Sequence, residues 1–270
     1  MSLVYIDTNV FLGFYQLSKD RLIVFKEILD RAQNVILTQQ TVEEFRRNRI
    51  VILMRLADEF KDLANKNYSM PATAVIRELP GFEHCKMTNY EAKDAMLKIA
   101  QEFGSWIDEE ASDLVLTEFN KLVNMATIVP TDASLIERAH TRKLLGQPPT
   151  SKDKYTIGDE LNWESLLQGA TDDVAVVSRD KSFLNNRSLM AAEFVQRTGK
   201  NLLLVTDSLS EGLKTVGKAS EKIKSAEESL PSPASQTPLF DKYSRLRCLN
   251  CGSMTWNGAR CFDCGFMDDD

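Results

Sequence analysis

The sequence predicts an α/β fold built on a central parallel sheet, followed by a linker and a small cysteine-containing module. Two observations predict the fold: short apolar runs alternate with helical patterns through residues 3–207, and acidic residues follow two of the runs closely. Four closely spaced cysteines near the C-terminus set the module apart. We therefore expect a main domain at residues 1–207, a linker at 208–244 and the module at 245–270.

Four short apolar runs are the expected strands. They are Leu3–Ile6, Val35–Leu37, Val174–Val177 and Leu202–Val205. Short apolar runs of this kind are typical of strands that are buried on both faces of a parallel sheet. Ligands of such sheets bind at the carboxyl ends of the strands, which is where Asp7 and Asp180 are expected to lie.

Helical patterns fill the intervals between the expected strands. They cover residues 18–32, 41–53, 91–103, 111–123, 132–145, 157–167 and 190–198. Thr41 is expected to begin its helix in a capping box with Glu44, and Thr131 or Asp132 is expected to cap the helix at 132–145. Residues 68–123 are irregular at first and then helical, so we expect a mostly helical insertion there.

The overall composition is that of a globular protein. The 270 residues are 43% hydrophobic and 27% charged, with a formal net charge of −6. This balance gives no general attraction for nucleic acid, although clustered carboxylates that bind metal ions would also produce it. The sequence shows no secretory signal pattern and no apolar run of roughly 20 residues, the length needed to cross a bilayer, so we expect a cytoplasmic location.

The segment at 208–244 has the composition of a linker. Lys214–Ser229 is rich in Lys, Ala, Glu and Ser, as in a solvated helix. Pro231, Pro233 and Pro238 then interrupt the chain among small polar residues.

The module contains two Cys-x-x-Cys-Gly motifs. Their cysteines are Cys248 and Cys251 in the first motif, and Cys261 and Cys264 in the second. Each spacing lets one tight turn present two sulfurs, and four thiolates form the tetrahedral set of a structural zinc site. Redox motifs or disulfides are the alternative, but duplicated motifs favour zinc. The module resembles a zinc ribbon, in which Trp256 and Arg260 are suited to contacts with nucleic acid and Trp256 equally to covering a small core.

Four acidic residues are the candidate site of the main domain. They are Asp7, Glu44, Asp159 and Asp180. Asp7 and Asp180 follow expected strands, Glu44 lies early in the helix after the second strand, and Asp159 lies at the start of the helix at 157–167. Four carboxylates at one sheet edge repel one another unless a divalent cation neutralises them, and oxygen ligands favour Mg²⁺ or Mn²⁺. Such a site suits phosphodiester hydrolysis by a metal-activated water. Each acid alone is equally consistent with a helix cap or a dipole partner.

Four local motifs contain these residues in one order along the chain. They are Tyr5–Phe11 (YIDTNVF), Val42–Phe45 (VEEF), Ile157–Asp159 (IGD) with Trp163 and Glu164, and Val177–Phe183 (VSRDKSF). In type and order they resemble the motifs of PIN-domain nucleases, over about residues 3–207. The resemblance implies a three-layer fold, a Mg²⁺- or Mn²⁺-dependent endoribonuclease and RNA as partner, although no residue by itself distinguishes RNA from DNA. The interval between the second and third motifs is long for a compact PIN domain.

Neighbouring residues extend the candidate site. Asn9 and Ser178 are expected to support it by hydrogen bonds, and Arg46 and Lys181 are candidates for phosphate contacts. Arg47 and Arg49 follow Arg46 on more than one helix face and are equally consistent with a solvated surface. Other acids compete as ligands: Glu43 with Glu44, Glu160 and Glu164 with Asp159, and Asp172 or Asp173 with Asp180.

Two other functions are consistent with parts of the sequence. A haloacid-dehalogenase-type phosphatase also begins with an apolar strand and an Asp, but it requires a second Asp where this chain has Asn9. A catalytically inactive PIN-like scaffold could bind nucleic acid or a protein partner through the zinc ribbon or the helical insertion. The complete acidic set argues against a scaffold, because clustered charge without a cation gives it no advantage.

Overall fold

The computed structural model describes residues 2–16, 22–66, 73–151 and 154–217, which belong to one compact unit. The four cysteines of the predicted zinc ribbon, and the predicted linker from residue 218 onward, lie outside the described residues. Among the described helices none is long and apolar enough to cross a membrane.

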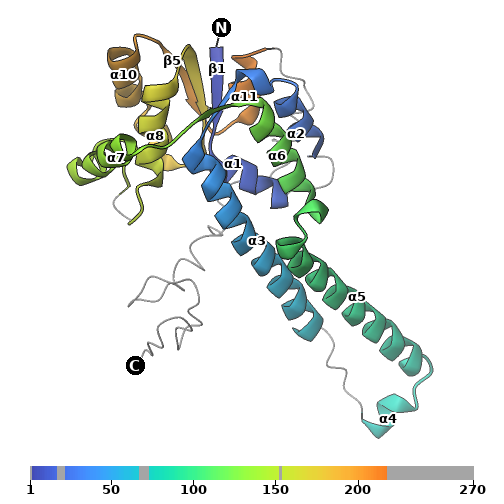
Figure 1. Ribbon diagram of the computed structural model, residues 1–270. Coiled ribbons are helices and arrows are strands. Elements are labelled where there is room, and N and C mark those ends of the chain that lie inside the picture. The colour runs from blue at the N-terminus through green and yellow to red at the C-terminus, as the bar shows by residue number, and fades with distance from the viewer. Residues whose placement is uncertain (1, 17–21, 67–72, 152–153, 218–270) are drawn as a thin grey trace, which may run out of the picture. The chain divides into compact units, whose positions relative to one another are not determined.

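The centre of the domain is a five-stranded sheet in which all strands are parallel (Figure 1). Its strands are β1 Ser2–Ile6, β2 Val35–Thr38, β3 Thr127–Val129, β4 Asp173–Val177 and β5 Leu202–Thr206. The strand order is β3-β2-β1-β4-β5. Strands β2 and β3 therefore lie on one side of β1, and β4 and β5 lie on the other side, so the direction of strand addition reverses between β1 and β4. Ligands of doubly wound sheets bind at such a switch point, outside the carboxyl ends of β1 and β4. The predicted parallel α/β sheet is confirmed.

Helices cover both faces of the sheet, which gives three layers. They are α1 Thr8–Leu12, α2 Leu22–Leu29, α3 Gln39–Lys66, α4 Ala74–Arg77, α5 Phe82–Asp108, α6 Leu114–Met125, α7 Ala133–Leu145, α8 Gly158–Gly169, α9 Lys181–Leu184, α10 Arg187–Thr198 and α11 Leu209–Lys214. Short 3₁₀ turns lie at Gly13–Gln16, Ala32–Asn34 and Glu110–Ser112.

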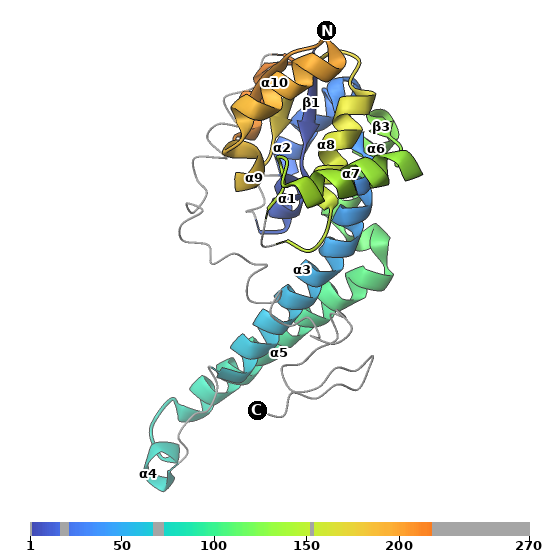
Figure 2. The same ribbon diagram turned by 90° about the vertical axis from the view of Figure 1, so that its left-hand side faces the viewer.

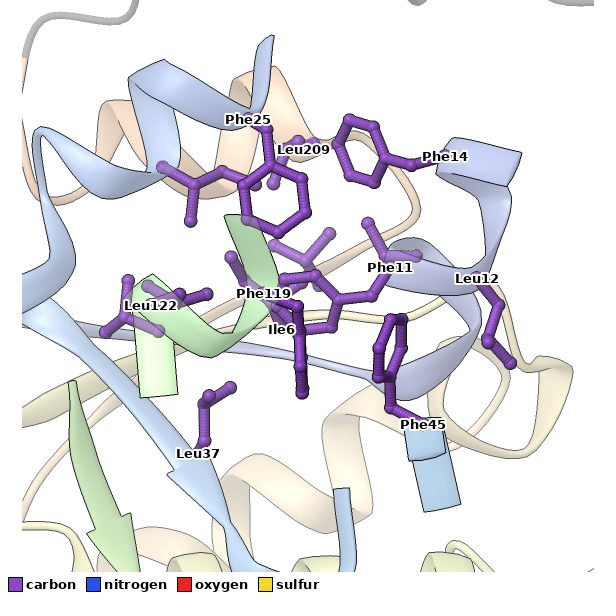
Figure 3. Packing of buried hydrophobic residues seen from close by; sticks show 14 of the residues in the cluster. Ile6, Phe11, Leu12, Phe14, Phe25, Leu37, Phe45, Phe119, Leu122 and Leu209 are labelled. Atoms are coloured by element: carbon purple, nitrogen blue, oxygen red, sulfur yellow. The ribbon is translucent and has the colours of Figure 1, made fainter. Parts of the chain in front are cut away.

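Strand side chains alternate between two buried clusters, because successive residues of a strand point to opposite faces. Val4 and Ile6 of β1 pack on one face with residues of α1, α2, α3, α6 and α11. Leu3 and Tyr5 pack on the other with residues of α8, α9 and α10. The first cluster is rich in phenylalanine, and Figure 3 shows Phe11, Phe25, Phe45 and Phe119 gathered beside β1.

The predicted insertion at 68–123 contains α4 and the long helix α5, whereas α6 at its end packs in the core. Helix α5 lies antiparallel beside α3, which precedes the insertion, and the two long helices extend away from the sheet (Figures 1 and 2). Their 28 and 27 residues correspond to lengths of about 40 Å. Phe60 and Phe103 contact each other between the two helices, with ring centroids 6.0 Å apart. Helix α5 begins at Phe82, earlier than the predicted 91, because most of its first residues are exposed and show no apolar period.

Three other local predictions differ from the structure. The predicted capping box is wrong, because α3 begins at Gln39 and the Thr38 side chain accepts the hydrogen bond of the Thr41 N–H at 3.0 Å. Strand β3 was not predicted, since it has three residues and only one is buried. The linker was predicted to begin at 208, but α11 buries Leu209 and Leu213 in the core and therefore belongs to the packed domain.

Candidate active site at the carboxyl ends of β1 and β4

Asp7 follows β1 directly and is held by three hydrogen bonds. The Thr8 N–H donates to Oδ1 at 2.8 Å, while Ser178 Oγ and Asn9 Nδ2 donate to Oδ2 at 2.6 and 2.8 Å. The carboxyl is 5% exposed, and burial raises its pKa from 3.8 to about 6, against the opposing effect of the Ser178 hydrogen bond. The predicted supporting residues Asn9 and Ser178 thus both contact Asp7.

The turn after β4 places Asp180 beside β1. Ser178 Oγ accepts a hydrogen bond from the Asp180 N–H at 3.1 Å, and Asn9 Oδ1 accepts one from the Arg179 N–H at 3.2 Å. Asp180 caps α9, because its Oδ1 accepts the Ser182 N–H at 2.7 Å. These bonds join the two strand ends across the switch point.

Asp159 lies in the first turn of α8 and shares a partner with Asp180. Lys154 Nζ donates to Asp159 Oδ2 at 2.7 Å and also to Asp180 Oδ2. Burial raises the pKa of Asp159 to about 7, with Lys154 opposing the rise and Asp180 and Asp7 adding to it. Burial acts to raise the pKa of Asp180 as well, but the nearby Lys154 ammonium has the stronger effect, so the pKa of Asp180 is lowered.

Glu44 faces the same group of carboxylates from the second turn of α3. Its pKa is raised by burial and by the charge of Asp159, while Lys154 acts in the opposite direction. Helices α3 and α8 approach closely here: a Cβ on Gly158 would lie 3.6 Å from Glu44 Oε2 and 3.1 Å from Gln40 Nε2. The glycine of the third motif therefore has a steric reason, because a side chain there would crowd Gln40 and Glu44.

A buried chain of hydrogen bonds beneath the carboxylates connects β1, β2, α3 and α8. Tyr5 Oη is 2.9 Å from Thr41 Oγ1, which is 2.9 Å from Thr38 Oγ1. Thr38 Oγ1 in turn donates to Asn162 Oδ1 at 2.5 Å. These contacts set the positions of the two helices that carry Glu44 and Asp159.

The competing acids have other partners and lie outside this group. Glu164 is 3% exposed and is bound by the guanidinium groups of Arg138, Arg142 and Arg197 at 2.6–3.2 Å. Glu160 pairs with Lys143 at 3.2 Å. In addition, Glu43 is exposed and pairs with Arg47 and Gln39, while Asp172 and Asp173 lie at the amino end of β4.

The candidate phosphate contacts differ in their placement. Lys181 is exposed and directly follows Asp180, at the start of α9. Arg46 is exposed but lies two positions after Glu44, about 200° around the helix, so it extends from another face. Arg49 is buried and donates to Asp113 at 2.7 Å, which makes it structural.

The donor set fits a divalent cation. Four carboxylates provide only oxygen ligands, as Mg²⁺ and Mn²⁺ prefer. Burial is the main reason that the pKa values of Asp7, Glu44 and Asp159 are raised, and the charges of neighbouring carboxylates add to the rise. In the part of the chain that the structure describes, no three Asp, Glu, His or Cys side chains stand in a ready metal-binding arrangement. Lys154, which no sequence motif singled out, also lies among the acids.

The strand order and the acidic residues at its switch point define an α/β protein with a carboxylate site at the end of β1. A family model described as PIN domain matches residues 4–183, which include all four carboxylates and cover more than half of the chain. The chain therefore belongs to the PIN-domain family, whose members are typically nucleases. Searches of curated proteins and of solved structures found no match.

Proposed function

We propose that this chain is a metal-dependent nuclease that hydrolyses phosphodiester bonds, with Asp7, Glu44, Asp159 and Asp180 as the ligands of Mg²⁺ or Mn²⁺. The observation that carries the proposal is the meeting of these four carboxylates, from four separate elements, at the switch point of the sheet. Membership of the PIN-domain family supports it, as does the absence of the second Asp that the phosphatase alternative requires.

A bound divalent cation would lower the pKa of a water molecule and stabilise negative charge on the phosphate. The chain's own residues prepare the ligands for it. Ser178, Asn9 and the Thr8 N–H hold both oxygens of Asp7 in one orientation. The Ser182 N–H does the same for one oxygen of Asp180. Such orientation reduces the reorganisation that ligand groups need when a cation or a substrate binds.

RNA is the proposed substrate, with cleavage inside the strand, and this part of the proposal rests on the family resemblance. The zinc ribbon and the α3–α5 helices are candidate contacts for RNA or for a protein, and a cytoplasmic location is proposed from the sequence. The main experiment incubates the full chain with single-stranded and structured RNA and DNA, with Mn²⁺ and with a chelator. RNA cleavage that depends on Mn²⁺ would support the proposal.

Two variants make this experiment specific. Asp7→Asn should abolish cleavage, because it removes a ligand charge with little change of volume. Asp173→Asn is the matched control, since it removes a carboxylate at the opposite end of β4. Chelator-resistant cleavage, or full activity of Asp7→Asn, contradicts the metal mechanism. Metal binding without cleavage of any nucleic acid would favour the scaffold alternative.

A further inference from the structure

Lys154 is directed into the carboxylate group although it lies in the loop between α7 and α8. Its Nζ lies 2.7 Å from Asp159 Oδ2 and also contacts Asp180. The Lys154 side chain is itself 42% exposed and the next residue, Tyr155, is fully exposed, so the ammonium reaches the carboxylates from the surface of the domain.

The flanks of this loop are attached to the domain. On the α7 side, Arg142 donates to the carbonyl oxygen of Pro148 at 2.6 Å and Lys143 donates to that of Ser151 at 2.9 Å. On the α8 side, Ile157 packs against the buried cluster formed by Leu135, Ala139 and Leu161. These contacts attach the described flanks of the loop to α7 and to the start of α8.

The ion pairs divide the four carboxylates into two pairs. Asp159 and Asp180 share Lys154. Among the described residues, no Lys or Arg forms an ion pair with Asp7 or Glu44 within 4 Å. Lys154 thus bridges Asp159 and Asp180 directly, whereas its charge acts on Asp7 and Glu44 only from a greater distance.

Building on the proposed metal-dependent function, we propose that Lys154 takes the place of one divalent cation, so that this site binds one tightly held ion rather than two. The charges are consistent with this assignment. Four ionised carboxylates face one ammonium and one divalent ion, which together supply three positive charges. A second divalent ion beside the ammonium would make the group net positive, whereas without the ammonium it would make the group neutral.

The test measures Mn²⁺ binding rather than cleavage. The zinc-loaded full chain is titrated with Mn²⁺ and free Mn²⁺ is followed by electron paramagnetic resonance, for wild type and Lys154→Met. We expect the first ion to bind both proteins. The second ion should bind Lys154→Met at least tenfold more tightly than wild type, about 1.4 kcal/mol. Adding Asp180→Asn to Lys154→Met should reverse this gain.

Two controls isolate the charge of Lys154. Lys154→Arg retains the charge and should keep the second ion weak. Lys121→Met removes another lysine that lies 2.7 Å from a carboxylate, that of Glu118, and should bind Mn²⁺ as wild type does. If Lys154→Met does not fold, as judged by circular dichroism, Lys154→Gln gives the same comparison.

The outcomes separate this inference from the function on which it rests. Equal affinity for the second ion in wild type and Lys154→Met, or two tightly bound ions in wild type, overturns the role of Lys154 alone. Failure of wild type to bind any Mn²⁺ at these carboxylates overturns the metal-dependent function as well.

Discussion

Asp7→Asn is expected to stabilise the divalent-free protein at neutral pH while it removes metal binding. Burial, opposed by the Ser178 hydrogen bond, raises the pKa of Asp7 from 3.8 to about 6 in the folded state. A shift of this size corresponds to about 3 kcal/mol, at about 1.36 kcal/mol per pKa unit. The ionised carboxylate therefore lowers the free energy of unfolding when no cation is bound.

The sign of the pH dependence follows from the raised pKa. Between about pH 4 and pH 6 the folded protein binds a proton that the unfolded chain releases, so stability falls as the pH rises through this window. The asparagine variant lacks this loss. In this variant an amide replaces the carboxylate that accepts hydrogen bonds from Ser178 and Asn9. The poorer hydrogen bonding lowers the free energy of unfolding by about 1–2 kcal/mol at every pH. Near neutral pH the variant should therefore be more stable by about 1–2 kcal/mol.

The assay is urea unfolding followed by circular dichroism at about pH 4.5 and pH 7.5, without added divalent cations. The stability of Asp7→Asn relative to wild type should increase by about 2 kcal/mol between the two pH values. Asp173→Asn should show little change between these two pH values, because the Asn201 backbone and side chain lower the pKa of Asp173 and its titration therefore lies below this window. Added Mn²⁺ should stabilise wild type but not Asp7→Asn. A stability difference that is the same at both pH values would refute the reasoning.

Three further predictions concern the site, the core and the module. Mn²⁺ affinity should rise with pH and level off above about pH 7, because Asp7 and Asp159, with pKa values of about 6 and 7, bind a cation only when they are ionised. Calorimetric titration at several pH values measures this affinity, and an affinity that does not change with pH would contradict the prediction. Glu164→Gln should destabilise the fold by about 3 kcal/mol in urea unfolding, since it removes the buried carboxylate that three arginines share and leaves only Glu193 to pair with Arg142. Mn²⁺ binding of the folded protein should nevertheless persist. Cys248→Ser should lose the single zinc ion that elemental analysis is expected to find in wild type; equal zinc in both would exclude this site.

The sheet could be predicted because its signals are local. Leu3–Ile6 and Val174–Val177 are short apolar runs bounded by polar residues, and burial on both faces is what such runs require. Strand β3 escaped detection because it depends on pairing with β2 at an edge, and most of its surface is not buried. The start of α5 was not predicted for a similar reason. Its first turns are mostly exposed and show no helical spacing of apolar residues, so they depend on the rest of the long helix.

The choice of carboxylates shows the limit of a local pattern. Asp159 and Glu164 lie five positions apart on α8, about 140° around the axis, and both are acids near one motif. Motif register favoured Asp159, and the structure shows that Glu164 is enclosed by arginines from α7 and α10. Partners such as Arg197 are distant in sequence, so only the packing of three helices could reveal the structural role of Glu164.

The sequence by itself predicted the parallel α/β fold, the PIN-domain motifs and the four candidate acids, because each signal depends on residues close together in the chain. Only the tertiary structure decided which groups these acids meet. The switch point joins Asp7 to Ser178, and the loop before α8 brings Lys154 between Asp159 and Asp180. The energy of a charge depends on its distance to other charges and on its exposure to water, and both quantities are defined only when distant segments pack together.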